Sequence, residues 1–309
     1  MSIEVLAVNI SEKKGTVKLP QSSITLNENG VEKDAHSGGW HRQVSLLGQE
    51  SFDKFSKQAG REIAYGEFAE NITTRGELLY EMHPLDRLIG ENIELEVTQI
   101  GKKCHGDNCA IYREVGNCVM PKEGIFARVI RGGELKAGDQ LEFRPKIWKA
   151  LVITLSDRAS RGEYADKSGP ALKRFIELHY SQTNRNVEIT TVIIPDDELT
   201  LTEQIKWAKL NDFDLIMTTG GTGIGERDIT PDVVTKLVDK TIPGIMEHIR
   251  LKYGAEKPNA LLSRGIAGVI GKMQIYTLPG SPKAINEYCS EIFKTLDHAF
   301  LMLHNIDGH

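Results

Sequence analysis

The residues best suited to chemistry lie in one glycine-rich segment, residues 213–232, with the sequence FDLIMTTGGTGIGERDITPD. An apolar run over 215–217 predicts a buried strand. Glycines then give a loop whose backbone can approach a ligand closely, and they are Gly220, Gly221, Gly223 and Gly225. Thr230-Pro231 predicts a helix start, with Thr230 as the N-cap and Pro231 in the first turn. A strand, a glycine loop and a helix N-terminus together predict an anion-binding site.

The same loop carries two carboxylates, Glu226 and Asp228. Because carboxylates repel phosphate unless a cation lies between them, the segment predicts a phosphate-bearing ligand held with a divalent metal, Mg²⁺. The loop lacks the Gly-Lys-Ser/Thr of a Walker loop, and its glycine spacing is not that of the dinucleotide fingerprint. A tight structural turn without a ligand is the alternative.

The composition describes a globular chain with room for two domains, since it has 309 residues, 40% of them hydrophobic and 26% charged. A net charge of −5 gives no reason to expect a nucleic-acid or membrane-surface partner. No apolar run approaches the roughly 20 residues needed to span a bilayer. Four cysteines do not form a disulfide framework in a chain of this length, so we expect a cytoplasmic location.

The first half of the chain is predicted to be rich in short strands, with one helix over 45–59. Frequent glycine between short strands is typical of a barrel or rolled sheet. The predicted strands cover 3–8, 16–19, 24–26, 93–97, 125–130 and 140–143.

Residues 144–146 read as a linker, after which strands alternate with helices. This alternation predicts a mostly parallel sheet with helices on both faces. The predicted strands cover 150–155, 187–194, 213–218 and 274–278, and the helices 168–180, 200–210, 230–237, 243–253 and 281–303.

Ligands of such sheets bind at the carboxyl ends of the strands. Polar residues gather there in this sequence: Ser156-Asp157-Arg158, Asp196, the glycine loop with Asp228, and Pro279-Gly280-Ser281, with Ser263-Arg264 in a nearby turn. Each alone could be a cap, a turn residue or a solvated charge. Their convergence on one edge favours a binding site.

Three motifs at these positions, SDRASRGEYADKSGP, TTGGTGIGERDITPD and LPGSPKA, resemble the molybdopterin adenylyltransferase family, including its gephyrin-like relatives. The resemblance covers residues 148–309. It implies a three-layer α/β fold, often trimeric, and Mg²⁺-dependent transfer of AMP from ATP to molybdopterin with release of pyrophosphate.

The resemblance also implies roles for particular residues. Asp196 and Asp228 would be the catalytic, metal-holding acids. Phosphate would lie against Gly220, Gly221, Thr222 and Gly223. The nucleotide and pterin subsites would be lined by Ser156, Asp157, Arg158, Ser263, Arg264, Pro279, Gly280 and Ser281.

The first half contains a group of cysteines, of which Cys104 follows Lys102-Lys103 and precedes His105, while Cys109 and Cys118 lie nearby. A thiol beside cationic groups ionises more readily and is a better nucleophile. The spacing differs from the paired CxxC of structural zinc sites. Each cysteine could also be a small buried hydrophobe, the reading we prefer for Cys289.

The segments GVEKDAHSGGWHRQVSLL, ENITTRG, EVTQIGKKCH, NCVMPKEGIFARVIRGG and LKAGDQL resemble the MOSC domain, named for the C-terminal part of molybdenum cofactor sulfurase. This resemblance covers residues 1–145. It implies a β-rich, barrel-like fold that binds the cofactor or a sulfur-bearing group. Cys104 is the favoured sulfur carrier, with Cys118 next, and the cleft would be lined by His36, His41 and Arg42. The two histidines could instead serve only turn hydrogen bonds.

Together the resemblances imply a bifunctional cytoplasmic protein of molybdenum cofactor biosynthesis. Its expected partners are small-molecule substrates, other proteins of that pathway, and copies of itself in a homotrimer formed by the C-terminal domain. The alternatives are a molybdopterin carrier without turnover, a gephyrin-like scaffold, and a nucleotide-binding protein unrelated to molybdenum.

Overall fold

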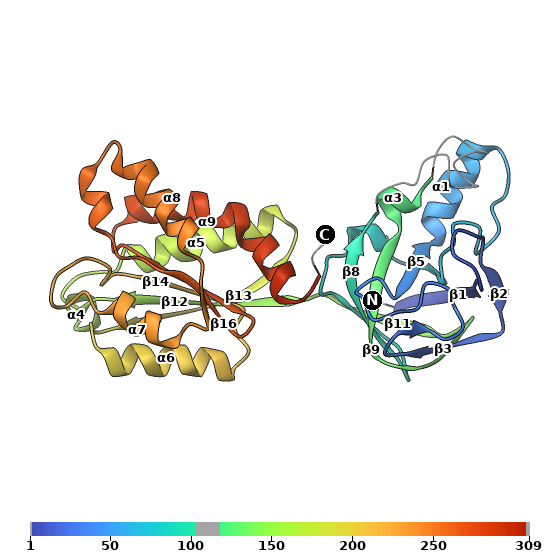
Figure 1. The fold of residues 1–309 in the computed structure, drawn as a ribbon, viewed down its shortest axis with the longest axis horizontal. Helices are drawn as coiled ribbons and strands as arrows, with labels where there is room; N and C mark the ends of the chain where they lie inside the picture. Colours follow the sequence, from blue (N-terminus) through green and yellow to red (C-terminus); the bar gives the residue numbers. More distant parts are fainter. Residues whose placement is uncertain (1, 103–117, 307–309) are drawn as a thin grey trace. The chain divides into compact units, whose positions relative to one another are not determined.

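The computed structural model describes residues 2–102 and 118–306. The chain divides into two compact units, Met1–Lys146 and Ile147–His309 (Figure 1). Strand β11 (Gln140–Arg144) ends the first unit, and β12 (Ile147–Leu155) begins the second.

The N-terminal unit is a closed β-barrel. Its main sheet runs in the order β11-β7-β8-β9-β5-β6-β1-β2, and the pairing of β1 with β11 closes it. A smaller sheet has the order β10-β3-β4. The remaining strands are β1 (Ser2–Ile10), β2 (Leu19–Gln21), β3 (Ser23–Asn27), β4 (Gly30–Val31), β5 (Val44–Gly48), β6 (Ile72–Arg75), β7 (Arg87–Ile89), β8 (Glu94–Ile100), β9 (Ile125–Arg131) and β10 (Gly133–Lys136). The predicted barrel-like fold is confirmed.

Alternation along the strands fills the barrel interior. In β8, Leu95 and Val97 point into the core, as do Ile3 and Val5 of β1. A second apolar cluster lies outside the barrel, where helix α1 (Gln49–Ala59) buries Phe52 and Phe55. The short helix α3 (Met120–Glu123) adds Met120 to this cluster.

Two predicted elements of this unit are wrong at their boundaries. Residues 45–48 belong to strand β5 rather than to a helix, because β5 is covered on both faces. Leu46 faces the barrel core and Leu47 faces the outer cluster. A strand buried on both faces reads as a continuous apolar run, which sequence periodicity cannot distinguish from a buried helix. The strand predicted over 16–19 begins only at Leu19.

The C-terminal unit is a three-layer α/β domain. Its sheet has the order β13-β12-β14-β17-β16-β15, in which β13, β12, β14 and β17 are parallel and the last two pairings are antiparallel. The further strands are β13 (Asn186–Ile194), β14 (Leu215–Thr219), β15 (Lys240–Thr241), β16 (Ala267–Ile270) and β17 (Met273–Leu278). The predicted fold class is confirmed, although β15 and β16 were not predicted.

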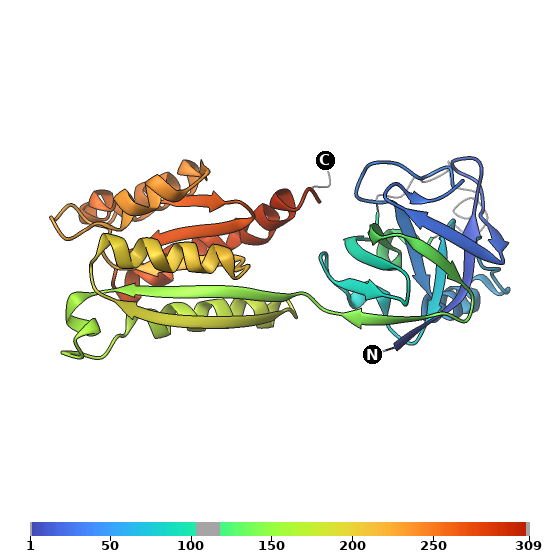
Figure 2. The same cartoon turned by 90° about the horizontal axis from the view of Figure 1, so that it is seen from below.

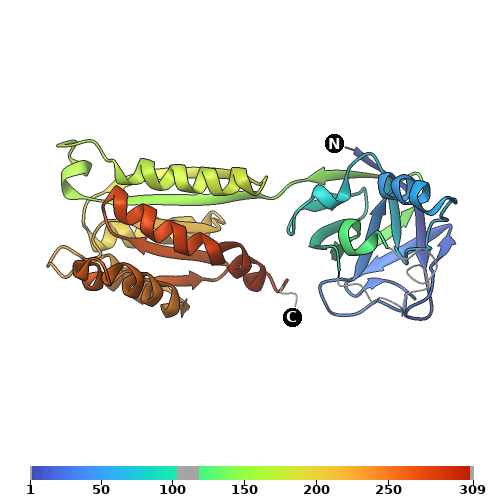
Figure 3. The same cartoon turned by 90° about the horizontal axis from the view of Figure 1, so that it is seen from above.

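Helices cover both faces of this sheet. One face carries α5 (Ser168–Gln182), α8 (Pro243–Gly254) and α9 (Pro282–Leu303), and the other carries α6 (Glu198–Leu210) and α7 (Thr230–Leu237) (Figure 1). Figure 2 shows α6 in front of the strands, and Figure 3, from the opposite side, shows α5 and α9. Leu201 and Ile205 of α6 pack with Val233 and Val234 of α7 over the sheet.

Helix starts lie at the carboxyl ends of the strands. Asp197 caps α6 and Ser281 caps α9 through side-chain hydrogen bonds. The predicted N-cap of α7 is wrong, since Ile229 is the cap and Thr230 is the first helical residue. Thr230 is fully buried and its Oγ1 donates to Gly220 O at 3.0 Å, so its hydroxyl holds the glycine loop. Among the described residues, no helix has the length and apolar character to cross a membrane.

Candidate functional site

The glycine loop begins where β12, β14 and β17 end together. Gly220 has φ +106°, and its N–H donates to Leu278 O at 2.9 Å. A Cβ at this position would lie 2.3 Å from Leu155 O. Only glycine therefore fits between the ends of the two neighbouring strands.

The amides after Gly220 are available to a ligand. Within the described part of the chain, no acceptor takes a hydrogen bond from the N–H groups of Gly221, Thr222 or Gly223. Thr222 is only 4% exposed. Gly221 and Gly223 are half-buried, and successive loop N–H groups without a protein acceptor favour an anion.

Arg264 fixes the shape of this loop. Its Nε donates to Gly223 O at 2.7 Å, its Nη1 to Asp232 Oδ1 at 2.9 Å, and its Nη2 to Asp228 O. The guanidinium is thus engaged by the protein, and its direct contact with a ligand stays a prediction.

The Asp228 carboxylate folds back against its own loop. Its Oδ2 accepts from Gly225 N at 2.8 Å. A Cβ at Gly223 would lie 2.7 Å from the same oxygen. Glycine at this position therefore lets the carboxylate approach the loop backbone.

Asp196 follows β13 and is tied to the turn after β12. Asp157 N donates to Asp196 Oδ2 at 3.1 Å, and Asp196 N donates to Asp157 Oδ1 at 3.2 Å. Arg227 forms an ion pair with the Asp157 carboxylate. Asp196 Oδ1 lies 3.7 Å from the position that a Cβ of Gly221 would occupy, so Asp196 stands beside the glycine loop.

The charges at this edge act on one another. Burial raises the pKa of Asp196, and the negative charges of Asp157 and Asp228 raise it further, while Arg227 opposes them. Asp196 and Asp228 therefore lie on the same edge of the sheet, within electrostatic reach of each other.

The donor set suits a metal that arrives with its ligand. Among the described residues, no group of three His, Cys, Asp or Glu side chains is arranged to hold a metal ion. Mg²⁺ in nucleotide sites is commonly held by one or two carboxylates together with phosphate oxygens. Asp196 and Asp228 match that pattern.

The predicted subsite residues near β12 lie on the short helix α4 (Asp157–Ser160) and its cap. Ser156 Oγ accepts from Ala159 N at 3.2 Å and is 3.0 Å from Tyr164 Oη. The exposed Arg158 guanidinium lies 5.0 Å from the centre of the Tyr164 ring.

The predicted residues near β17 have mainly structural contacts. Ser263 Oγ accepts from Tyr288 Oη at 2.9 Å. Pro279 O accepts from Thr219 Oγ1 at 3.1 Å. A Cβ at Gly280 would lie 3.4 Å from Gly220 Cα, so these two glycines allow the loops after β14 and β17 to touch.

Two residues of this edge were missed in the sequence. Arg227 adjoins Asp228 and partly neutralises Asp157. Asp166 accepts hydrogen bonds from Thr154 Oγ1 at 2.7 Å and from Ser168 N at 2.8 Å, which ties the start of α5 to β12. The DKSG run around Asp166 was a signal for this capping arrangement.

In the N-terminal unit, the predicted site residues have different neighbours. His36 N donates to Asp34 Oδ1 at 2.9 Å. Thr98 Oγ1 donates to His41 O at 2.6 Å. Cys118 is half-buried and packs beside the outer apolar cluster. Cys104 lies outside the described residues.

Arg42 is a desolvated cation at the barrel surface. Its guanidinium carbon lies 4.1 Å from the centre of the Trp40 ring and 5.8 Å from that of Phe126. Its Nε is buried with no hydrogen-bond partner among the described residues. Burial lowers the pKa of Arg42. Such a cation favours an anionic ligand.

The fold is a β-barrel followed by a three-layer α/β domain whose glycine loop lies beside two acids. Residues 151–298 match the family model described as a probable molybdopterin binding domain, and residues 33–142 match the MOSC domain. The chain belongs to this molybdopterin-binding family and carries a MOSC domain before it.

Curated relatives align with about half of the chain. The molybdenum cofactor synthesis protein cinnamon of Drosophila melanogaster is 35% identical over 149 residues, 48% of this chain and 24% of its own length. The molybdopterin adenylyltransferase of Helicobacter pylori strain J99 is 35% identical over 155 residues, 48% of this chain and 82% of its own. This chain thus spans about a quarter of cinnamon's length and most of the bacterial enzyme's.

A solved structure is also similar. The molybdopterin biosynthesis enzyme MoaB from Thermus thermophilus is 34% identical, with 50% of this chain and 96% of that chain covered and a TM-score of 0.46. The names of these relatives refer to molybdenum cofactor synthesis and to molybdopterin adenylylation.

Proposed function

We propose that the C-terminal domain, residues 148–309, transfers AMP from ATP to molybdopterin with Mg²⁺ and releases pyrophosphate. The observation that carries this proposal is the glycine loop beside two acids, Asp196 and Asp228. Its N–H groups at Gly221, Thr222 and Gly223 have no acceptor among the described residues. A relative 35% identical is named a molybdopterin adenylyltransferase.

The protein's own groups would bind and orient the reactants. The loop amides would hold the ATP phosphates and take the charge that develops during transfer. Asp196 and Asp228 would hold Mg²⁺, which would neutralise phosphate charge. Arg264 keeps the loop in the shape that this binding requires. The remaining subsite contacts would come from Ser156, Asp157, Arg158, Gly220, Ser263, Pro279, Gly280 and Ser281.

The rival function is a carrier that holds molybdopterin without turnover. Pyrophosphate release by the full chain with ATP, Mg²⁺ and molybdopterin separates the two. The proposal requires release that depends on all three reactants. Pterin retention without pyrophosphate release would favour the carrier.

We also propose that the N-terminal domain, residues 1–145, binds the cofactor or a sulfur-bearing group. The desolvated Arg42 supports an anionic ligand there. His36 and His41 would line the same cleft. The preferred candidate for a sulfur carrier in this unit is Cys104, and the next candidate is Cys118. The wild-type, Cys104→Ser and Cys118→Ser chains are incubated with polysulfide as the sulfane-sulfur donor, which leaves one sulfur shorter, and mass spectrometry locates the persulfide. Labelling unchanged in both variants would reject both cysteines.

The proposed setting is the cytoplasm, with other proteins of molybdenum cofactor biosynthesis as partners. A homotrimer through the C-terminal domain is the proposed assembly. Light scattering of the full chain tests it, since a mass of one chain would exclude the trimer.

A further inference from the structure

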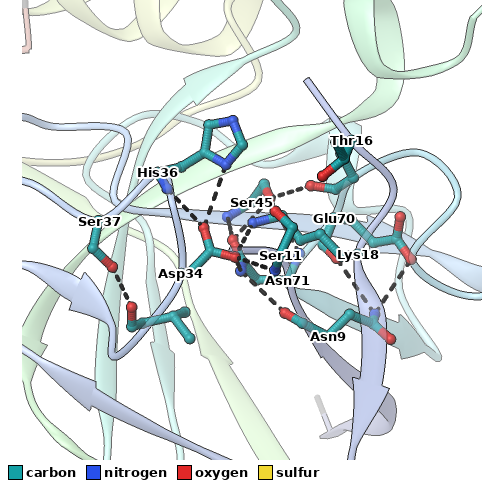
Figure 4. A network of polar contacts seen from close by, with 12 residues as sticks. Asn9, Ser11, Thr16, Lys18, Asp34, His36, Ser37, Ser45, Glu70 and Asn71 are labelled. Carbon is teal, nitrogen blue, oxygen red and sulfur yellow. Dashed lines mark hydrogen bonds and ion pairs between the residues drawn. The ribbon is translucent and has the colours of Figure 1, made fainter. Parts of the chain in front are cut away.

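A buried ion pair joins the loop before β2 to the turn after β4, next to His36 (Figure 4). Lys18 Nζ is 2.5 Å from Asp34 Oδ2, and both side chains are only 1% exposed. The same oxygen accepts from Ser11 N at 3.0 Å and from Asn71 Nδ2 at 3.2 Å. Three donors therefore converge on one carboxylate oxygen, which fixes the orientation of Asp34.

The other oxygen of Asp34 faces His36. Asp34 Oδ1 accepts from His36 N at 2.9 Å and lies 3.3 Å from His36 Nδ1. Nδ1 forms no hydrogen bond with the described residues, so its contact with Asp34 Oδ1 is electrostatic only. Nδ1 is buried, whereas the His36 side chain as a whole is 37% exposed. The outer part of the ring thus remains accessible.

The backbone around His36 is also fixed. Ala35 N donates to Ser11 O at 2.8 Å, and Gly38 N donates to Asn29 O at 2.7 Å. Ser37 Oγ donates to Val31 O. The main chain at His36 is therefore held beside Asp34.

Asp34 is held as an anion. Burial alone would raise the pKa of Asp34, but the contacts with His36 and Lys18 outweigh burial and lower it below the usual range. A carboxylate cannot donate, so Asp34 Oδ1, which lies 3.3 Å from Nδ1, repels a lone pair on that nitrogen and attracts a proton there. The proton of a neutral His36 then belongs on Nδ1, and Nε2 keeps its lone pair.

We propose that Asp34, anchored by Lys18, is a positioning residue that fixes the tautomer of His36 and makes Nε2 a hydrogen-bond acceptor for the ligand of the N-terminal domain. The ligand rests on the proposed function of this domain, and its group at His36 would be a donor, such as a pterin ring N–H. The tautomer itself does not depend on the ligand. Neutral histidine in water prefers the opposite form, with its proton on Nε2.

The test is long-range ¹H–¹⁵N NMR of the full, ligand-free chain labelled at histidine nitrogen, at a pH where His36 is neutral. The His36 signals are assigned by their loss in His36→Gln. We expect the wild-type spectrum to show a protonated Nδ1 and an unprotonated Nε2. A wild-type His36 with its proton on Nε2 would overturn the proposal without any variant.

The variants remove the anchor. Asp34→Asn alone leaves Lys18 buried without its partner and endangers folding, so the decisive variant is Lys18→Met combined with Asp34→Asn. We expect His36 in it to shift toward the Nε2–H form, while Glu32→Gln, which removes a neighbouring exposed carboxylate, leaves the spectrum unchanged. An unaltered Nδ1–H tautomer in the folded double variant would contradict the role of Asp34.

Pterin binding separates this inference from the proposed function. Retained pterin per chain is measured by fluorescence after oxidation, and the amount lost in the variants reports the N-terminal site, because the proposed C-terminal site is unchanged in them. We expect about tenfold weaker binding at the N-terminal site in His36→Gln and in the double variant, the effect of one lost hydrogen bond. If His36 has the expected tautomer but no pterin binds at this site, the proposed function of the N-terminal domain is rejected and the role of Asp34 stands. Binding unaffected by both variants would remove His36 as a ligand contact.

Discussion

At the scale of single residues, the two acids beside the glycine loop are held by different hydrogen bonds. Asp196 is restrained by the backbone of Asp157, while Asp228 is restrained by the amide of Gly225 in its own loop. Both remain partly exposed. Carboxylates restrained in this way can bind a cation without a large loss of side-chain entropy.

Replacing Asp228 by Asn tests its proposed role. The side chain keeps its size and its oxygen for Gly225 N, so the fold should stay intact. Loss of the negative charge removes a metal ligand, and we expect AMP transfer to fall at least 100-fold, on the order expected for a lost electrostatic contact to the transition state. Pyrophosphate release measures it. The exposed neighbour Glu226, changed to Gln, is the control, and equal rates in wild type and Asp228→Asn would remove Asp228 from the site.

Glu70 is a second buried acid of the N-terminal unit, joined to Asp34 through Asn9 and Asn71 (Figure 4). It is fully buried, and burial raises its pKa to about 7. One oxygen accepts from Gly66 N and from Thr73 Oγ1, while Oε2 has no partner among the described residues. The folded barrel therefore favours the protonated acid.

This raised pKa predicts a pH-dependent stability. The group favours folding fully below its unfolded pKa of about 4.5, and this contribution is lost as pH rises to about 7. The loss is about 3 kcal/mol. Glu70→Gln should abolish this part of the pH dependence, measured by native-state hydrogen exchange of the barrel strands at pH 5 and pH 8. The exposed Glu12→Gln is the control. A Glu70→Gln barrel with the wild-type difference between the two pH values would contradict the assignment.

At the scale of elements, the strand-to-loop junction at Gly220 joins stability to function. Gly220→Ala forces a side chain into a left-handed backbone and within 2.3 Å of Leu155 O. We expect a loss on the order of 3 kcal/mol in the unfolding free energy of the C-terminal unit, together with loss of transfer activity. Urea unfolding measures the first effect.

The control for that change is Gly244 in α8. A Cβ there meets no atom within 4 Å, so Gly244→Ala should be neutral or stabilising by about 0.5 kcal/mol. Equal stabilities of the two variants would show that the junction tolerates a side chain.

The sequence predicted the parallel core of the C-terminal unit because each long apolar strand is followed by an amphipathic helix. It did not predict β15 and β16, whose short runs have no periodicity to detect. The predicted parallel sheet placed Asp196 and Asp228 at one edge, because each follows the carboxyl end of a strand. The sequence could not predict the clamp by Arg264 or the ion pair of Arg227 with Asp157, since these depend on how loops fold toward each other.

At the scale of the whole molecule, the two units have separate apolar cores. The barrel encloses one core, and the sheet with α6 and α7 encloses another. Lys146 N donates to Asp86 Oδ1 at 2.7 Å, so the first unit holds the chain up to the residue before Ile147. Each unit should therefore fold alone.

Expression of residues 147–309 alone tests this independence. We expect a cooperatively folding domain with the pyrophosphate release of the full chain, because every group of the proposed transfer site lies within it. Calorimetry and the release assay are the measurements. Loss of activity in a folded fragment would show that the barrel contributes to the transfer.

The central claim is that a magnesium-bound triphosphate lies at the glycine loop between Asp196 and Asp228. A crystal structure of the full chain with Mg²⁺ and a non-hydrolysable ATP analogue tests it most directly. The account predicts phosphate oxygens on the N–H groups of Gly221, Thr222 and Gly223, with the metal on the two acids. A nucleotide bound elsewhere on the chain, with this loop empty, would contradict it.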